Sequence, residues 1–299
     1  MKTNLPILDN LSAKDAEVIL ELSPKLEITF AKRLAKGSER KFYVETSRDD
    51  KRLLRIGNTA HYDWAEAGAR WYEYIASAGI NAMHLLDMGV LNDKTLLYQL
   101  YTWFDGDDLT EVLPHMSNTE QFFLGMKCGA VARKIHALPP LHETEPWGVR
   151  YKRKMHDKLQ AANHAASSRE GTLLMQYLQD HMSLLDNRPY TTTHGNWNTE
   201  NIILTPNGQI GVIDHGLDCN DPWFEFWEAP DDANAQAYFY TGQIKGYFGG
   251  NPPAEYFPLL TFYMAFGRIE WEYDFQCLLD WTDNMRNPVP IWYLSDYNG

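Results

Sequence analysis

A polar loop at residues 194–201, with the sequence His-Gly-Asn-Trp-Asn-Thr-Glu-Asn, combines residue types that suit chemistry on a phosphate group. Asn201 ends this loop, and Asp214 follows thirteen residues later, after the apolar pair Val212-Ile213. Side-chain oxygens of Asn and Asp are ligands that Mg²⁺ accepts, while phosphate and water fill its other positions. The pattern therefore indicates phosphoryl transfer, in which a protein orients a hydroxyl group and holds Mg²⁺ against the phosphates.

These segments resemble the aminoglycoside phosphotransferase family, small-molecule kinases that share the protein-kinase fold and include choline- and macrolide-type kinases. The family hallmark is His-Gly-Asp, four residues and Asn, followed by Ile-Asp, an aromatic residue or His, and Gly. This chain matches every fixed position except the first Asp, where it has Asn196. Other similar segments occur in the family's order, over roughly residues 25 to 295. They are Gly37-Ser38, Phe104-Asp105-Gly106, Lys134-Ile135-His136-Ala137-Leu138, Asp221-Pro222-Trp223 and Asn287-Pro288-Val289-Pro290, the last as in one bacterial subgroup.

The resemblance implies an α+β, bilobal protein-kinase-like fold, with a small antiparallel-sheet N-lobe and a large, mainly helical C-lobe. Residues 1–101 would form the N-lobe, with the nucleotide-binding sheet and a helix. Residues 102–107 would form a hinge, and residues 108–299 the C-lobe with the catalytic loop and acceptor-binding helices. Asn196, Asn201 and Asp214 are then expected to converge at the mouth of the cleft between the lobes.

The resemblance also implies a nucleotide site in the N-lobe and hinge. Arg55 would hold the α- and β-phosphates, where the family usually has Lys, and Glu66 or Glu73 of the next helix would position it. A glycine turn would cover the phosphates, and backbone groups of Thr102 and Phe104 would bind the adenine of ATP or GTP. These residues also have structural interpretations, as a plain hairpin, solvated charges and core aromatics. The predicted nucleotide-binding residues are Gly37, Ser38, Arg55, Glu66, Thr102, Trp103 and Phe104.

Asn196 occupies the position of the general base, and Asn201 and Asp214 are the expected Mg²⁺ ligands. A neutral amide can orient a hydroxyl group but cannot accept its proton, and loss of a general base commonly lowers the rate by ~10²-fold to 10⁴-fold. Three accounts fit Asn196. In the first, Asn was introduced in place of Asp to trap a complex. In the second, the protein is a natural kinase relative without turnover. In the third, the enzyme is active and the hydroxyl group is deprotonated in another way.

The acceptor is expected to be a cationic small molecule, because the net charge of −13 favours cations and disfavours nucleic acid. The resemblance implies an antibiotic such as an aminoglycoside or a basic peptide, bound by carboxylates of the C-terminal helices. Glu225, Glu270 and Asp274 are the predicted contacts, although most surface carboxylates are only solvated. The alternatives are a kinase for a choline-like or sugar-like alcohol, and a nucleotide-binding pseudokinase.

The elements that must position these residues follow from hydrophobic periodicity. Strands are predicted at 26–32, 41–46, 52–56 and 95–101, with helices at 11–22 and 63–77. Trp64, Gly68, Trp71 and Ile75 form the expected buried stripe of the second helix. Further helices are predicted at 118–138, 153–165, 171–186, 231–247, 253–267 and 268–285. Short strands are predicted at 190–193, 201–204 and 210–214, with a hairpin turn at residues 206–208, and His136 is expected to be a buried structural residue.

The composition fits an enzyme of the cytoplasm. With 299 residues and 44% hydrophobic content the chain can bury one large core or two lobes, and 10 Trp residues predict extensive aromatic packing. Three scattered cysteines are too few for a disulfide framework or a zinc site. The N-terminal residues lack the apolar core of a secretory signal, and the longest apolar stretch is too short to cross a membrane. A monomer and a homodimer both remain open.

Overall fold

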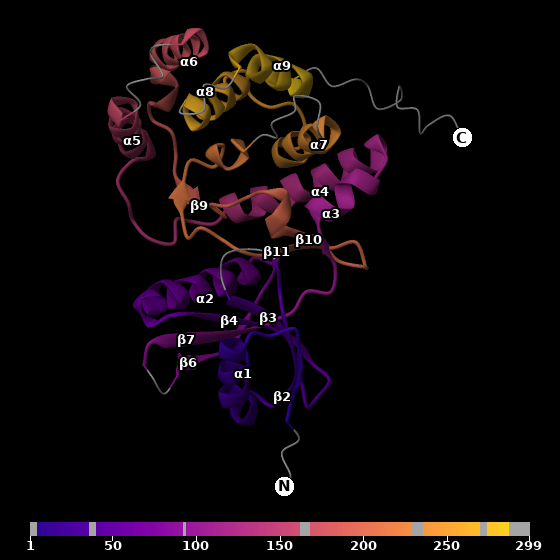
Figure 1. Ribbon diagram of the computed structural model, residues 1–299. Helices are drawn as coiled ribbons and strands as arrows, with labels where there is room; N and C mark the ends of the chain where they lie inside the picture. Colours follow the sequence, from indigo (N-terminus) through magenta and orange to yellow (C-terminus); the bar gives the residue numbers. More distant parts are fainter. Residues whose placement is uncertain are drawn as a thin grey trace, which may run out of the picture. The chain divides into compact units, whose positions relative to one another are not determined.

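The computed structural model describes residues 5–35, 40–91, 94–161, 168–228, 236–269 and 274–286. The chain divides into two compact units (Figure 1). The first consists of Met1–Ser77 and Asn81–Asp105, and the second of Ala78–Ile80 and Gly106–Gly299. The division after Asp105 falls within the segment that was predicted as the hinge.

Six strands of the first unit form one sheet, in the order β1-β2-β3-β4-β7-β6. They are β1 (Ile7–Asp9), β2 (Ile28–Arg33), β3 (Arg40–Thr46), β4 (Lys51–Asn58), β6 (Leu85–Val90) and β7 (Leu96–Thr102). β1 runs parallel to β2, and each other neighbouring pair is antiparallel. The sequence predicted β2, β3, β4 and β7 but not β1 or β6.

The core of the first unit lies between this sheet and α1 (Ala13–Leu26). Ile19 of α1 is fully buried, as are Phe42 and Val44, which alternate along β3 as predicted. Ser12 begins the helix by accepting a hydrogen bond from the backbone amide of Asp15. The amphipathic helix is thus capped and packed by the residues that its sequence places there.

Helix α2 (Tyr62–Ser77) contributes most of its predicted apolar stripe to the interior. Gly68, Trp71 and Ile75 are buried, but the side chain of Trp64 is 44% exposed. The prediction that Trp64 belongs to the buried stripe was therefore wrong. Trp64 lies in the first turn of the helix, where it lines a surface pocket with Gly57.

The second unit is mainly helical, with short strand pairs between its helices. Its longer helices are α4 (Asn118–His136), α5 (Trp147–Ala161), α6 (Arg169–Asp180), α7 (Ala237–Phe248), α8 (Tyr256–Arg268) and α9 (Phe275–Arg286). The shorter elements are α3 (Leu109–Val112), β8 (Asp107–Asp108), β9 (Thr191–Thr192), β10 (Ile202–Leu204), β11 (Ile210–Val212) and β12 (Cys219–Asn220). β10 pairs with β11 and β8, and β9 pairs with β12.

Aromatic side chains form much of the core around α5, α6 and α8. Tyr151 lies against Tyr263 with 5.1 Å between ring centroids and against Phe266 with 5.3 Å. The indole Nε1 of Trp147 donates to the hydroxyl of Tyr263 over 2.9 Å, which satisfies a buried donor. This packing accounts for part of the aromatic content that the sequence analysis noted.

Helices α4 and α7 lie side by side and approach each other through paired glycines (Figure 1). A Cβ atom on Gly129 of α4 would lie 1.9 Å from the carbonyl oxygen of Gln243. On α7, a Cβ atom on Gly246 would lie 2.1 Å from the carbonyl oxygen of Met126. Gly125 and Gly242 make equivalent approaches one turn earlier. The two backbones are therefore in contact, which only glycine permits.

Several predicted helix boundaries differ from those in the structure. α5 begins at Trp147 rather than 153, and α6 ends at Asp180, where a 3₁₀ turn (Met182–Leu185) takes over. The helices predicted at 253–267 and 268–285 correspond to α8 and α9. Residues 231–235 of the helix predicted at 231–247 lie outside the described residues. Within the described part of the chain, every helix is too short or too polar to cross a bilayer.

Candidate active site

The hairpin of β10 and β11 brings Asn201 beside the segment that leads to Asp214. Its strands pair Ile202 with Val212, and Thr205 closes the turn by donating its amide to the carbonyl of Gln209 over 3.0 Å. Beyond the last strand pair, the amide of Ile213 donates to the carbonyl of Asn201, also over 3.0 Å. The antiparallel pairing thus joins two residues that are far apart in the sequence.

Asn196, Asn201 and Asp214 are linked by direct hydrogen bonds within the second unit. The Nδ2 of Asn196 donates to the backbone carbonyl of Asp214 over 3.1 Å. The Nδ2 of Asn201 donates to the backbone carbonyl of Asn196 over 2.9 Å. The structure therefore brings together the three residues that the sequence analysis placed at the centre of the reaction.

The donor set of this cluster fits a magnesium ion. Because the Nδ2 of Asn201 donates to Asn196, the amide is oriented and its Oδ1 is the atom left for a cation. Asp214, whose backbone carbonyl accepts from Asn196, carries a carboxylate, and Mg²⁺ in proteins commonly uses one or two such groups together with phosphate oxygens. Among the described residues, no cluster of three or more His, Cys, Asp or Glu could hold a metal, so no all-protein cage competes with this arrangement.

Asp214 has a left-handed backbone conformation, with φ of 58°. Such a φ is uncommon for a residue other than Gly and is retained only where the surroundings enforce it. Hydrogen bonds on either side do so here: Ile213 binds Asn201, and the amide of Gly216 donates to the carbonyl of His194 over 2.7 Å. An uncommon backbone conformation is thus held in place at the residue whose carboxylate is the expected metal ligand.

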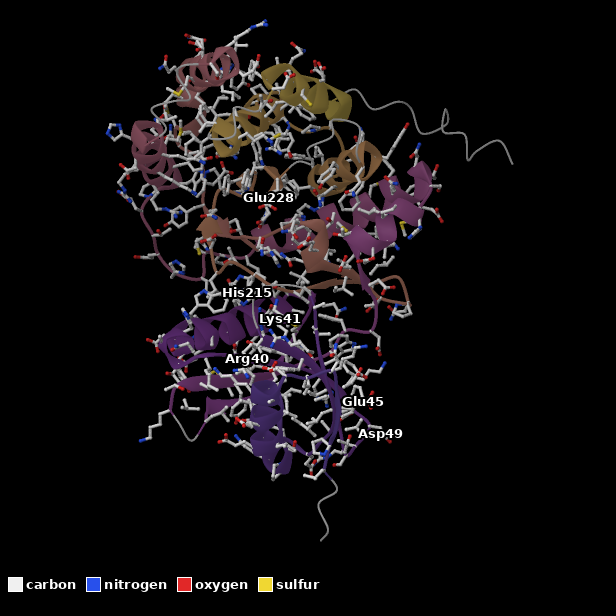
Figure 2. The ribbon with its side chains drawn as sticks, viewed as in Figure 1. Arg40, Lys41, Glu45, Asp49, His215 and Glu228 are labelled. Carbon is white, nitrogen blue, oxygen red and sulfur yellow. The ribbon has the colours of Figure 1, made fainter. Side chains whose placement is uncertain are left out.

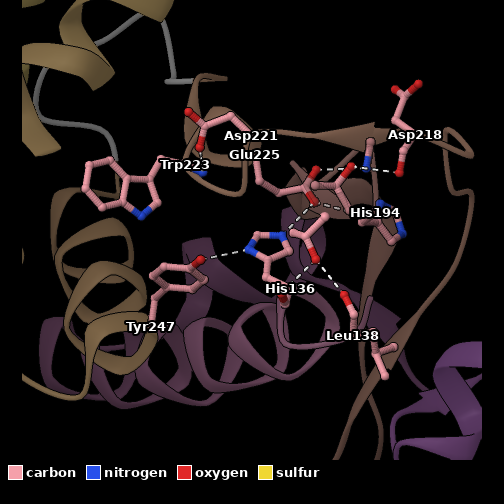
Figure 3. A network of polar contacts seen from close by, with 11 residues as sticks. His136, Leu138, His194, Asp218, Asp221, Trp223, Glu225 and Tyr247 are labelled. Carbon is pink, nitrogen blue, oxygen red and sulfur yellow. Dashed lines mark hydrogen bonds and ion pairs between the residues drawn. The ribbon is translucent and has the colours of Figure 1, made fainter. Parts of the chain in front are cut away.

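The loop of residues 194–201 corresponds to the catalytic loop of the family resemblance, and its start is held by Glu225, whose carboxylate is buried (Figure 3). Its Oε2 accepts from the backbone amide of His194 over 2.6 Å, and its Oε1 accepts from that of Gly195 over 2.8 Å. The Nε2 of His136 lies 3.1 Å from Oε2, and the hydroxyl of Tyr247 lies 3.0 Å from Nδ1 of the same ring. His136 is thus the buried structural histidine that the sequence predicted.

The electrostatics of this group follow from its contacts. Burial alone would raise the pKa of Glu225, but the hydrogen bond and charge of His136, with the amide of His194, lower it below the ordinary value. Burial lowers the pKa of His194, so the neutral ring is favoured, and its Nε2 donates to the carbonyl of Ile213 over 2.9 Å. The loop is therefore anchored by a buried carboxylate that keeps its charge.

This anchor corrects the expectation that Glu225 contacts the acceptor. Both of its oxygens are occupied by groups of the protein, and the residue is only 6% exposed, so an acceptor cation cannot reach it. The sequence contained a signal of burial. Glu225 stands in the run Trp223-Phe224-Glu225-Phe226-Trp227, where large apolar residues surround the single charge.

Asp221 fixes the turn that carries Glu225. Its carboxylate is fully buried and accepts two hydrogen bonds from Arg188, over 2.5 and 2.8 Å. Tyr263 donates to the same carboxylate over 2.8 Å, and the guanidinium of Arg188 lies over the ring of Trp223 at 3.9 Å. A 3₁₀ turn (Phe224–Phe226) follows directly. The Asp-Pro-Trp segment of the family resemblance is thus part of the support of the catalytic loop.

Arg55 lies in the first unit, on β4, and is 7% exposed between Lys41 of β3 and Gln99 of β7. A pocket of about 270 Å³ opens on the neighbouring surface and is lined by Gly57, Asn58, His61, Trp64, Ala65, Leu97 and Gln99. Gly57 stands two residues beyond Arg55 and therefore belongs to the same face of the strand. Glu66 forms an ion pair of 3.1 Å with Arg70, and Glu73 is exposed. The role of Arg55 in phosphate binding stays a prediction.

The predicted hinge residues have partners inside the first unit. The amide of Thr102 donates to the carbonyl of His84 over 3.0 Å, so it is not the group that would bind adenine. Trp103 packs edge-on against Tyr43, with 5.0 Å between ring centroids, which favours its structural interpretation. Adenine binding by the carbonyl of Thr102 and by Phe104 stays a prediction.

The remaining predicted contacts are only partly described. Gly37, Ser38 and Glu270 lie outside the described residues. Asp274 is exposed before α9, where its Oδ1 accepts from the amides of Gln276 and Cys277 over 2.8 and 3.1 Å. It therefore caps the helix, and its proposed contact with the acceptor is untested.

Comparison with known proteins bears on the family and the fold of the chain. A model of the phosphotransferase enzyme family matches residues 31–257, well over half of the chain. The GDP complex of wild-type aminoglycoside 2'-phosphotransferase-IIIa has a TM-score of 0.62 and 12% identity, covering 92% of this chain and 99% of that one. Macrolide 2'-phosphotransferase from Brachybacterium faecium has a TM-score of 0.59 and 13% identity, covering 93% and 99%.

A third solved structure, amicoumacin kinase in complex with AMP-PNP, Ca²⁺ and Ami, has a TM-score of 0.55 and 14% identity, covering 94% of this chain and 97% of that one. At such identities the likeness shows the fold. It confirms the predicted α+β class, with an antiparallel-rich first part and a helical second part. A search of curated protein sequences found no significant match.

Proposed function

The chain belongs to the phosphotransferase enzyme family, and on that premise we propose that it transfers the γ-phosphoryl group of ATP or GTP to a hydroxyl group of a cationic small molecule. An antibiotic, such as an aminoglycoside or a basic peptide, is the proposed acceptor. The cytoplasm, where nucleoside triphosphates and Mg²⁺ are present, is the proposed location.

One observation carries the proposal: Asn196, Asn201 and Asp214 form a single hydrogen-bonded cluster at the end of a β-hairpin. The cluster contains the oriented amide of Asn201, the carboxylate residue Asp214 with its enforced backbone conformation, and the side chain of Asn196 at the base position. Phosphoryl transfer depends chiefly on positioning and charge stabilisation, so a rigid set of oxygen ligands is what the reaction requires.

In the proposed reaction, each residue has a separate task. Asn201 and Asp214 would hold Mg²⁺, which when bound neutralises charge on the phosphates of the nucleotide. Asn196 would orient the acceptor hydroxyl but, being neutral, leaves its proton to another group. Arg55 would bind the α- and β-phosphates, with Gly37 and Ser38 over them and Glu66 supporting the arginine. Phe104 and the carbonyl of Thr102 would contact the base.

A cationic antibiotic as acceptor is supported by charge and by the neighbours. The net charge of −13 attracts cations to the protein. The similar structures include an aminoglycoside phosphotransferase and a macrolide phosphotransferase, and two of the three were solved with GDP or AMP-PNP. Glu270 and Asp274 remain the proposed acceptor contacts, since Glu225 has been assigned to the loop.

A pseudokinase is the second candidate, and Asn196 is the observation that favours it. A protein of this kind would bind a nucleotide through Asn201 and Asp214 without transferring phosphate. The two functions predict the same binding site and differ only in turnover. A kinase for a choline-like or sugar-like alcohol differs from the first proposal only in its acceptor.

The test compares the chain that has Asn196 with its Asn196→Asp variant. Each is incubated with ATP or GTP, Mg²⁺ and a panel of basic antibiotics, choline-like alcohols and sugars, and phosphorylated acceptor is measured by mass spectrometry. We expect phosphorylation of at least one basic antibiotic. Transfer to the alcohols alone would make the protein a metabolite kinase. If neither form phosphorylates any acceptor while both bind nucleotide, the pseudokinase function holds. Melting temperatures identify acceptors that bind without reacting.

A further inference from the structure

Lys41 is the second residue of β3 and follows Arg40 in the first unit (Figure 2). Successive side chains of a strand point to opposite faces of the sheet. Arg40 is on the face that α1 covers, where its Nε donates to the Oδ1 of Asp15 over 2.8 Å. Lys41 therefore lies on the other face of the sheet, where it is half-buried.

Arg55 lies on the same face as Lys41 and directly opposite it. Leu54 and Ile56, its neighbours on β4, are buried in the core that packs against α1, so Arg55 points away from that core. The register of β3 and β4 pairs Lys41 with Arg55. Side chains that face each other in this way have Cβ atoms ~5 Å apart. Two positive side chains thus leave the sheet at the same point.

This pairing of like charges is unfavourable for the sheet by itself. Like charges directly opposite each other destabilise an antiparallel strand pair. The same row continues to Gln99 of β7 and Met88 of β6, which are both neutral. Farther along β3, by contrast, Glu45 lies opposite Lys51, so the charges there are complementary. An anion bound by both Lys41 and Arg55 would offset the repulsion between them.

The position of Lys41 suits contact with the phosphates of a nucleotide. Lys41 stands three residues after Ser38, in the strand that follows the glycine turn expected to cover the phosphates. Arg55 is only 7% exposed, so it presents a small part of its guanidinium group to a ligand. The ammonium group of a lysine is a compact charge on a flexible stem, which can reach a second phosphate oxygen beside a buried arginine.

We propose that Lys41 is a second phosphate-binding residue, which together with Arg55 holds the polyphosphate chain of the nucleotide. The inference deepens the proposed phosphotransferase function and rests on it. An arginine binds two oxygens of one phosphate through its planar head, and the lysine adds a charge-assisted hydrogen bond to the same chain. The pair recognises the phosphates and not the base, so it serves ATP and GTP alike.

The first test measures the affinity of Lys41→Gln for ATP, GTP and inorganic tripolyphosphate by calorimetry in the presence of Mg²⁺. Each affinity should fall ~10-fold to 100-fold, the usual effect of removing a hydrogen bond to a charged group. Lys41→Arg keeps the charge and should retain most of the affinity. Lys51→Gln is the matched control, because Lys51 lies on the same face but is exposed and bound to Asp105 over 2.5 Å. It should change the affinities less than ~2-fold, since distant exposed charges are screened.

The melting temperature separates phosphate binding from a structural role. Without ligand, Lys41→Gln should melt at the same temperature as the unsubstituted chain or higher, because a contact between like charges is removed. Tripolyphosphate should then raise the melting temperature less in Lys41→Gln than in the unsubstituted chain, because it binds the variant more weakly.

Each outcome decides the proposal. Unchanged affinities in Lys41→Gln overturn the role of Lys41 and leave the phosphotransferase function in place. An equal loss of affinity in Lys51→Gln also overturns it, because general attraction by the positive charges would then suffice. A lower melting temperature of Lys41→Gln without ligand overturns it too, since a structural role would explain the loss. If the unsubstituted chain binds neither ATP nor GTP, the proposed function itself fails.

Discussion

The two ends of the catalytic loop are held by different kinds of interaction. At residues 194–195 the backbone is bound by the buried charge of Glu225, which His136 and Tyr247 support from α4 and α7. At residues 196–201 neutral amides bind one another and the backbone. His194 at the first end is buried and Gly195 is half-buried, whereas residues 196–201 range from buried (Trp197 and Asn201) to exposed (Glu200).

This difference distinguishes the residues that hold the loop in place, at 194–195, from the residues proposed to take part in the reaction, at 196–201. The anchored end fixes the loop whatever residue stands at position 196, because none of its hydrogen bonds involves that side chain. The amide end contains the residues that would orient the acceptor hydroxyl and hold Mg²⁺ in the proposed reaction. The anchor can therefore persist whether Asn or Asp stands at position 196. The predictions below disturb the anchored end, in order of decreasing effect.

The largest effect is expected from Gly129→Ala, which would force apart the helices that carry His136 and Tyr247. A Cβ atom there would lie 1.9 Å from a backbone carbonyl of α7, which cannot rotate away. We expect the free energy of unfolding to fall by about 3 kcal/mol, as for severe overpacking. Urea denaturation measures it. Gly57→Ala is the control, because open space surrounds that position. Equal effects of the two changes would show that the glycine contact is not tight.

Glu225→Gln attacks the anchor directly and should have a smaller effect. The new amide can accept only through one oxygen, so one of the two loop amides loses its partner, at a cost of about 2 kcal/mol. Both the free energy of unfolding, measured by urea denaturation, and kcat should fall. A free energy of unfolding equal to that of the unsubstituted chain would contradict the anchoring role of Glu225.

The smallest effect is a dependence of stability on pH that arises from His194. Burial lowers the pKa of His194 in the folded state, so below about pH 6.5 the unfolded chain binds a proton that the folded chain does not. The stability this group contributes is present above that pH and is lost as pH falls, by up to about 1.4 kcal/mol per pH unit. The free energy of unfolding, measured with urea between pH 5 and 8, should depend less on pH in His194→Gln. Parallel curves would contradict this assignment.

The sequence predicted those parts of the fold whose signals are local. Alternating Phe42 and Val44 marked β3, and the Pro-Asn-Gly turn marked the hairpin of β10 and β11. Strand β6 was missed because Asp87 and Gly89 interrupt its apolar pattern. The contact of α4 with α7 was missed because a glycine in a helix usually weakens it, and only a partner helix reveals its use.

The site shows the same limit. Residue type and spacing pointed to Asn196, Asn201 and Asp214, which do lie together. The environment of a carboxylate could not be obtained in this way, so Glu225 was expected to contact the acceptor. Its role as an anchor depends on hydrogen bonds to residues about thirty positions away in the sequence, and these require the folded structure.

The central proposal is that Asn201 and Asp214 hold the metal of a nucleotide complex. Its most direct test is a calorimetric titration of the unsubstituted chain with ATP and GTP, with and without Mg²⁺. The account predicts binding that Mg²⁺ strengthens, and a loss of ~10-fold or more in the Mg²⁺-dependent affinity on Asp214→Asn. Binding that is indifferent both to Mg²⁺ and to the residue at position 214 would contradict it.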